Sequence, residues 1–124
     1  MSEWDPEDLV MVEYLHELDI AFVRRDGRLR PYRIMWGVRV GDDFYVRSVN
    51  GRTAAWYRGT LTRHEGRILA GALELDVSFA DVEDDDLNAR IDEAYREKYG
   101  RNSRPVQHIT SFAARGATLR VAPR

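Results

Sequence analysis

The sequence predicts one α+β domain with a mainly antiparallel sheet or barrel of about six strands and flanking helices. Short stretches of alternating polar and apolar residues, joined by tight turn signals, indicate strands paired as hairpins. Three stretches with helical character indicate helices inserted around these hairpins. The chain has 124 residues, of which 44% are hydrophobic and 32% are charged, and this composition is typical of a single globular domain.

The first predicted element is a helix from Pro6 to Leu18. Asp5 is a suitable N-cap, Pro6 suits the first helical position, and the acidic residues that follow favour the positive end of the helix dipole. A short strand is expected at residues 20–24, before a turn signal of Arg, Asp and Gly at residues 25–27.

The next two strands are predicted to form a hairpin. Residues 32–40 alternate between apolar and polar side chains, which indicates a strand with one buried face. A Gly-Asp-Asp loop follows, and residues 44–49 return as the next strand. We expect Val40 to pair with Phe44 across this loop.

Helices and hairpins alternate in the rest of the chain. Thr53 is expected to cap a helix that ends near Arg63, and Gly100 to terminate a helix that runs from about Asp85 to Tyr99. The remaining elements are a hairpin of strands at 66–70 and 72–79, an irregular segment at 101–115 and a last strand at 117–121.

The composition excludes several kinds of site. Without cysteine the chain has no disulfide, no iron–sulfur cluster, no cysteine-ligated zinc and no catalytic thiol. Its three histidines, His16, His64 and His108, lack the spacing of metal ligands, so we expect no metal. No apolar stretch approaches the roughly 18 residues that span a bilayer, and the acidic N-terminus is unlike a signal peptide. We therefore expect a cytoplasmic protein without a membrane partner.

The net charge of −2 conceals an uneven distribution of charge. Residues 24–67 contain eleven arginines and four acidic residues, and residues 99–124 contain five arginines and no acidic residue. Residues 1–23 and 68–98 are acidic. Such asymmetry can mark a site for an anionic ligand, and the more common alternative is that the blocks neutralise each other in the fold. Because the chain as a whole is not basic, we do not expect nucleic acid as a partner.

One group of residues is a candidate binding site for a phosphorylated, planar ligand. A strand ends at Arg47 and Ser48, the chain turns, and a helix begins whose first turns carry aromatic residues. A helix N-terminus presents free N–H groups to an anion, arginine binds phosphate bidentately, and an aromatic ring can stack on a flat ligand. The candidate binding residues are Arg28, Arg33, Trp36, Arg47, Ser48, Arg52, Trp56 and Arg58. The alternative is a hairpin–helix corner with core aromatics and solvated arginines.

The runs WGVRVGDDFYVRSVNGRTAAWYRG, GRILAGALELDVSF and AYREKYG resemble a family of small bacterial proteins known only as a domain of unknown function, over about residues 20–124. At longer range the layout is similar to the split β-barrel proteins that bind flavin or deazaflavin, above all the deazaflavin-dependent nitroreductase-like family. The pieces that correspond are Gly27-Arg28, Arg33, Arg47-Ser48, Ala55-Trp56-Tyr57, Ala94-Tyr95 and residues 118–121. The resemblance implies a split β-barrel in one domain over residues 1–124.

The resemblance also implies a function. It suggests an oxidoreductase that uses FMN or a deazaflavin coenzyme and forms a homodimer, with the cofactor at the subunit interface. Arginines and Ser48 would hold the phosphate, Trp36 or Trp56 would lie against the ring system, and Tyr57 or Tyr45 would donate a proton.

The sequence departs from the relatives at their phosphate loop. There, Gly-Arg is followed by a Ser-Gly pair, whereas this chain continues from Arg28 with Leu29, Arg30 and Pro31. Arg30 can compensate for the missing pair, or the cofactor site can be degenerate. The alternative function is therefore a cofactor-free binding module or enzyme that acts on a small anionic or aromatic metabolite.

Overall fold

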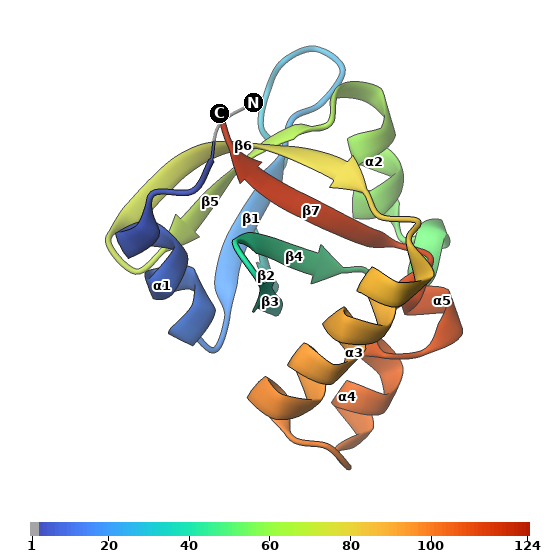
Figure 1. Ribbon diagram of the computed structural model, residues 1–124. Coiled ribbons are helices and arrows are strands. Elements are labelled where there is room, and N and C mark those ends of the chain that lie inside the picture. Colours follow the sequence, from blue (N-terminus) through green and yellow to red (C-terminus); the bar gives the residue numbers. More distant parts are fainter. Residues whose placement is uncertain (1–2) are drawn as a thin grey trace.

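The computed structural model describes residues 3–124, without the side chains of residues 61 and 62 (Figure 1). The elements are, in chain order, α1 (Pro6–Tyr14), β1 (Leu18–Phe22), β2 (Arg33–Met35), β3 (Gly37–Val40), β4 (Asp43–Arg47), the 3-10 turn η1 (Gly51–Thr53), α2 (Ala55–Arg63), β5 (Glu65–Ala70), β6 (Leu73–Asp81), α3 (Asp85–Tyr99), α4 (Arg104–Ile109), α5 (Phe112–Arg115) and β7 (Thr118–Pro123). Within these residues no helix has the length and apolar character that a bilayer-spanning segment needs.

All seven strands belong to one antiparallel sheet in the order β2-β1-β5-β6-β7-β4-β3. The strands at its two edges, β2 and β3, follow each other in the chain and are separated by Trp36 alone. A sheet whose two edges are joined by one residue has to curl round on itself, and Figure 1 shows the strands wrapping round an interior. The expected α+β split β-barrel is therefore confirmed, with seven strands and the opening of the barrel at Trp36.

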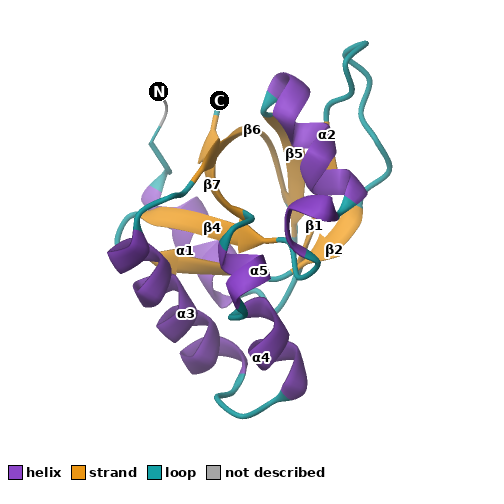
Figure 2. Cartoon of the chain, turned by 90° about the vertical axis from the view of Figure 1, so that its right-hand side faces the viewer, coloured by secondary structure: helices purple, strands orange, loops and turns teal. Residues whose placement is uncertain are grey.

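Two apolar clusters lie on opposite faces of this sheet. In β4, Phe44 and Val46 point into the barrel, where they join the larger cluster with Ile20, Phe22 and residues of every other strand except β3. Side chains alternate along a strand, so Tyr45 points outward. There it joins a second cluster with α3 and α4, which lie against the outside of the barrel (Figure 2). The outer face of β4 is thus buried rather than solvated.

The register of the predicted hairpin is wrong by one residue. Val40 pairs with Asp43, and Arg39 pairs with Phe44. Gly41 has φ of +63°, which lets a two-residue turn of Gly41 and Asp42 close the hairpin. The sequence prediction placed three residues in this loop.

Several expected boundaries also change. The predicted strand at 32–40 is broken at Trp36, and the first helix ends at Tyr14 rather than at Leu18. The segment at 101–115, expected to be irregular, forms α4 and α5, because the hydroxyls of Ser103 and Ser111 each cap a helix.

The expected cap of α2 is absent. The N-cap position is Ala54, whose side chain makes no capping hydrogen bond. Thr53 lies in η1 instead, where its hydroxyl donates to the Asn50 carbonyl at 3.0 Å. Among the residues that the structure describes, no side chain caps the free N–H groups at the N-terminus of α2.

Gly37 is packed against Phe44, and we predict that Gly37→Ala destabilises the fold. A Cβ at this position would lie 2.2 Å from Cζ of Phe44, whose ring is fully buried and cannot move aside. The free energy of unfolding should fall by about 1–3 kcal/mol or more in urea denaturation. Gly41→Asn is the control, because nothing lies within 4 Å and asparagine tolerates a positive φ. Equal stability of the two variants would contradict the packing described here.

Candidate functional site

A cleft of about 610 Å³ opens beside the break in the barrel, between β2, the N-terminus of α2 and α4. Figure 2 shows these three elements on one side of the molecule. The volume of the cleft lies in the range of small-molecule binding sites. The lining residues are Arg33, Ile34, Met35, Trp36, Arg47, Val49, Asn50, Ala54, Ala55, Trp56, Arg104, Pro105, His108 and Ile109.

The described residues that line the cleft include no acidic side chain. Arg33 reaches it from β2, and Arg104 and His108 reach it from α4, where they are four residues apart and lie on one helical face. Neither Arg33 nor Arg104 forms an ion pair within the part of the chain that the structure describes. The cleft consequently carries uncompensated positive charge, which favours an anionic ligand.

Two tryptophans line the cleft, and each is supported by a second aromatic ring. Trp36 stacks on Tyr99 with ring centroids 3.9 Å apart and planes at 5°, and Trp56 stacks on Phe22 at 4.9 Å and 22°. The backbone at Trp36 is also held, since the Tyr95 hydroxyl donates to its carbonyl at 3.2 Å. These contacts give the cleft fixed aromatic surfaces suited to a flat ligand.

A second pocket of about 330 Å³ adjoins the cleft and shares Arg33, Ala55 and Trp56 with it. Its further lining includes Arg30, whose Nε is buried and has no hydrogen-bond partner among the described residues. The guanidinium of Arg30 lies against Gly59 of α2, where an added Cβ would come within 3.2 Å of Nε. The absence of a side chain at Gly59 thus leaves room for the guanidinium of Arg30 beside the cleft.

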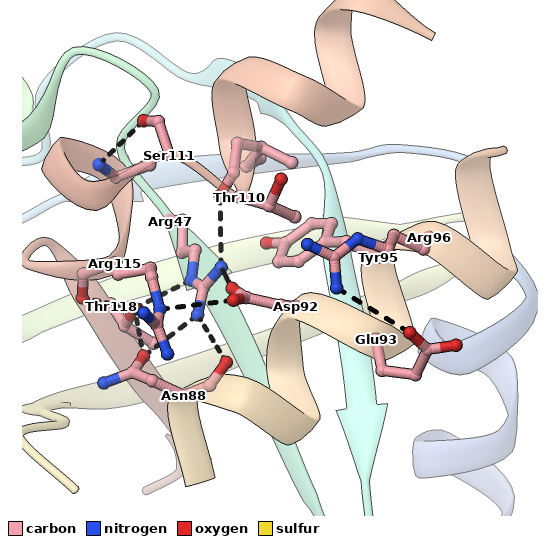
Figure 3. Close-up of polar contacts among 12 residues, drawn as sticks. Arg47, Asn88, Asp92, Glu93, Tyr95, Arg96, Thr110, Ser111, Arg115 and Thr118 are labelled. Atoms are coloured by element: carbon pink, nitrogen blue, oxygen red, sulfur yellow. Dashed lines mark hydrogen bonds and ion pairs between the residues drawn. The ribbon is translucent and has the colours of Figure 1, made fainter. Parts of the chain in front are cut away.

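Arg47 was predicted from the sequence to bind the ligand. In the structure its guanidinium is instead hydrogen-bonded to other residues of the protein (Figure 3). Its side chain is fully buried, and its five N–H groups all have protein acceptors. Nε donates to the Thr118 hydroxyl at 2.8 Å, one terminal nitrogen donates to Asp92 and to the Ile109 carbonyl, and the other donates twice to Asn88. Arg47 therefore has no donor left for a phosphate.

The charges around Arg47 are arranged to keep it ionised. Asp92 pairs with Arg47 through one carboxylate oxygen and lies 3.2 Å from Nε of Arg115 through the other. Burial lowers the pKa of Arg47, and the hydrogen bond and charge of Asp92 oppose this effect. Because arginine starts from such a high pKa, the side chain stays a cation.

The two tyrosines expected to be catalytic lie away from the cleft. Tyr57 is buried in the larger apolar cluster, and its hydroxyl donates to Asp81 Oδ1 at 2.7 Å. Burial, followed by this contact with Asp81, raises the pKa of Tyr57 to about 12. Tyr45 belongs to the cluster outside the barrel, and burial raises its pKa as well. Neither hydroxyl lines the cleft.

The other predicted binding residues divide into two groups. Arg33, Trp36 and Trp56 line the cleft together, as expected for one site. The structure does not bring the remaining four to it. Arg28 is exposed in the loop after β1, and Arg58 is exposed two residues beyond Trp56, about 200° round the helix.

Ser48 and Arg52 are the last two of these four. The Ser48 hydroxyl is buried and has no hydrogen-bond partner among the described residues. The Nε of Arg52 donates to the Gly116 carbonyl at 2.7 Å, beside a separate pocket of about 240 Å³. Neither residue is among those that line the cleft.

The sequence prediction did not include Arg104 or His108 among the binding residues. Both were assigned to an irregular segment, so nothing indicated that they share a helical face. The Ser-Arg-Pro start of α4 is the signal that identifies them, since serine caps a helix and proline suits its first turn. Among the described residues, no group of three or more His, Asp and Glu side chains is placed to hold a metal ion.

Fold and site together define a split β-barrel protein with a cationic, aromatic cleft. The chain belongs to the bacterial family described as "Uncharacterized protein conserved in bacteria (DUF2255)", which matches residues 8–121. The resemblance to such a family is thereby confirmed. No curated protein matches the chain by sequence.

Solved structures confirm the distant similarity to split barrels. The chain is similar to HutZ, the heme storage protein of Vibrio cholerae, with TM-score 0.73 and 16% identity over 100% of this chain and 92% of that one. An F420-H2 dependent reductase, FDR-A, matches with TM-score 0.62 and 12% identity over 86% and 93% of the two chains. A NimC/NimA family protein of Clostridium acetobutylicum matches with TM-score 0.66 and 12% identity over 94% and 79%. At these identities the similarity concerns the fold.

We predict that Arg47→Met lowers the free energy of unfolding by about 3–5 kcal/mol in urea denaturation, because it leaves Asp92 buried without its main partner. Ser48→Ala is the control at the adjacent residue. It removes a buried hydroxyl that has no partner, so stability should stay equal or rise by up to about 1 kcal/mol. An Arg47→Met protein of undiminished stability would contradict the structural role of this arginine.

Proposed function

We propose that the protein binds a planar, phosphorylated cofactor of the flavin type, FMN or a deazaflavin coenzyme, in the cleft and acts as an oxidoreductase. The observation that carries the proposal is the lining of the cleft, which combines two supported tryptophans with Arg33, Arg104 and His108 and no acidic side chain. The fold of FDR-A, which is described as an F420-H2 dependent reductase, supports the same class.

The residues of the cleft fit such a group. Ala54 and Ala55 place the uncapped N-terminus of α2 at the cleft, where free N–H groups attract an anion. Arg33 lies beside it, and Arg30 contributes to the adjoining pocket a buried nitrogen that lacks a partner within the described part of the chain. We assign the phosphate to this end, and the flat ring system to the space between Trp36 and Trp56.

A flavin-type group supplies hydride transfer when it is bound, and the chain's own residues supply binding and a proton. The indoles of Trp36 and Trp56 orient the ring, and the apolar residues around them exclude water. His108 lines the cleft from α4, and histidine is the side chain that most often serves as a general acid or base. We therefore assign to its imidazole the role of holding a proton for the substrate, in place of Tyr57 and Tyr45.

A cofactor-free function is the second candidate. The turn expected to hold phosphate, at Gly27 and Arg28, lies outside the cleft and lacks the Ser-Gly pair of the relatives. In this case the same cleft takes a small anionic or aromatic metabolite, through the same arginines and tryptophans.

The first experiment is a titration of tryptophan fluorescence with FMN, riboflavin, the deazaflavin coenzyme and haemin. Trp36 and Trp56 report on the cleft, whereas Trp4 is buried in the barrel and donates to the Val121 carbonyl. We expect saturable quenching by FMN or the deazaflavin at micromolar concentration, about −8 kcal/mol of binding, and weaker quenching by riboflavin, which lacks the phosphate. Quenching by none of these ligands favours the cofactor-free candidate. Tight binding of haemin alone would overturn the flavin assignment.

We predict that Arg33→Ala and Arg104→Ala each raise the Kd for the bound phosphorylated cofactor about tenfold or more, since each removes a charged hydrogen bond worth about 1.5–3 kcal/mol. Arg58→Ala is the matched control, because Arg58 is an exposed arginine outside the cleft. Unchanged Kd values for both cleft variants, measured by the same titration, would contradict the assignment of the phosphate to this site.

We also propose a homodimer that covers the rim of the cleft. Ile34 and Val49 line this rim and are 66% and 48% exposed. Apolar side chains exposed beside a binding site are typical of a surface that a partner covers.

The corresponding prediction concerns Ile34→Asp, which should convert a dimer to a monomer in light scattering at micromolar concentration. Val10→Asp is the control, because Val10 is 45% exposed on α1 and lies outside the cleft. A wild-type protein that is monomeric under these conditions would contradict the proposed dimer.

A further inference from the structure

Lys98 is the chain's single lysine, and it lies in the last turn of α3. Its Nζ donates to the Gly37 carbonyl at 2.7 Å and to the Val12 carbonyl at 3.5 Å. These contacts connect α3 to β3 and to α1. Within the described residues Nζ forms no ion pair, so a half-buried amine is held by backbone carbonyls alone.

Lys98 is half-buried and lines a pocket of about 400 Å³. Tyr14 and Glu97 line this pocket and are exposed, so it opens to the surface. Val38 and Ala94 add apolar lining. The pocket is separate from the ligand cleft, with which it shares no lining residue.

The surroundings favour the neutral, nucleophilic form of this amine. Burial lowers the pKa of Lys98 to about 8, against a smaller opposing effect of Glu13. The charged groups that face the pocket are Glu13 on α1, Arg39 on β3 and Glu97 on α3. Glu13 is itself paired with Arg39 at 3.0 Å, and the ring of Tyr99 lies 5.2 Å from Nζ.

We propose that Lys98 is an acylation site, which small activated acyl donors of the acyl phosphate class reach through this pocket. The neutral Nζ attacks the acyl carbonyl carbon, and a nitrogen–carbon bond forms while the carbon–oxygen bond to phosphate breaks. Phosphate leaves, and the amine proton passes to solvent. The product is an uncharged amide with one N–H in place of an amine with at least two.

Acylation at this position has a structural consequence for the wall of the ligand cleft. Lys98 and Tyr99 both donate to the Gly37 carbonyl, and Tyr99 stacks on Trp36. One amide N–H cannot donate to both carbonyls that Nζ contacts, so the end of α3 is held less firmly against Gly37 and α1. The proposal does not depend on which ligand the cleft binds.

The test is acetylation of the intact protein by acetyl phosphate between pH 6.5 and 10.5, followed by peptide mass spectrometry. The Arg90→Lys variant provides an exposed lysine on the same helix as an internal reference. At pH 8 we expect Lys98 to react at about half of its limiting rate, and the introduced lysine at less than about 1% of its own. A midpoint for Lys98 above about pH 10, or no acetyl group at Lys98 while the introduced lysine reacts, overturns the proposal.

A second measurement tests whether acylation of Lys98 affects Trp36. It uses a Trp4→Phe, Trp56→Phe background, in which Trp36 is the remaining tryptophan. We expect acetylation and Lys98→Gln to shift the emission of Trp36 in the same direction, and Lys98→Arg to leave it unchanged. Identical emission of the acetylated, Lys98→Gln and untreated proteins overturns the structural consequence. Because this readout needs no cofactor, it is independent of the outcome of the FMN titration.

Discussion

The buried ion pair of Arg47 and Asp92 is the interaction on which the arrangement around the cleft depends. It lies where β4, β7, α3 and the end of α4 meet. The side chain of Arg47, on β4, makes hydrogen bonds to residues of the other three elements (Figure 3). A charge so far from water is tolerated only when every donor is satisfied. The network therefore fixes α4 relative to the barrel, and with it the cleft residues Arg104 and His108.

A second constraint is the bend at Trp36 and Gly37, where one edge of the sheet becomes the other. The close approach of Gly37 to Phe44 leaves no room for a side chain at this point. From outside, the carbonyls of Trp36 and Gly37 accept hydrogen bonds from Tyr95, Lys98 and Tyr99 of α3. The opening of the barrel is thus held by one helix, and the indole of Trp36 is positioned as a wall of the cleft.

The charge of the molecule is neutralised in one region and left unbalanced in another. Around the barrel, arginines such as Arg39, Arg67 and Arg124 pair with carboxylates. In the cleft, Arg33 and Arg104 have no such partner among the described residues. Nearly equal numbers of acidic and basic residues therefore produce a locally positive surface, and this difference is what makes the cleft a candidate site for an anion.

The sequence determined the class of fold, the order of most elements and the types of residue at the site. Alternation in residues 66–79, the turn glycines and the caps Asp5 and Asp84 act within a few neighbouring residues, so their effects can be predicted locally. Arg33, Trp36 and Trp56 were also identified, from the arginines and aromatic residues around the predicted hairpin and helix and from the resemblance to split barrels.

Tertiary structure decided the role of each arginine and the make-up of the cleft. Arg47 and Arg33 carry the same chemical group, but α3 and α4 cover the outer face of β4 and enclose Arg47, whereas β2 lies at an open edge. The pairing with Asp92 spans 45 residues, and the cleft residues Arg33 of β2 and Arg104 of α4 are 71 residues apart along the chain. No local pattern encodes such contacts, because they form only when the two faces of the sheet are packed.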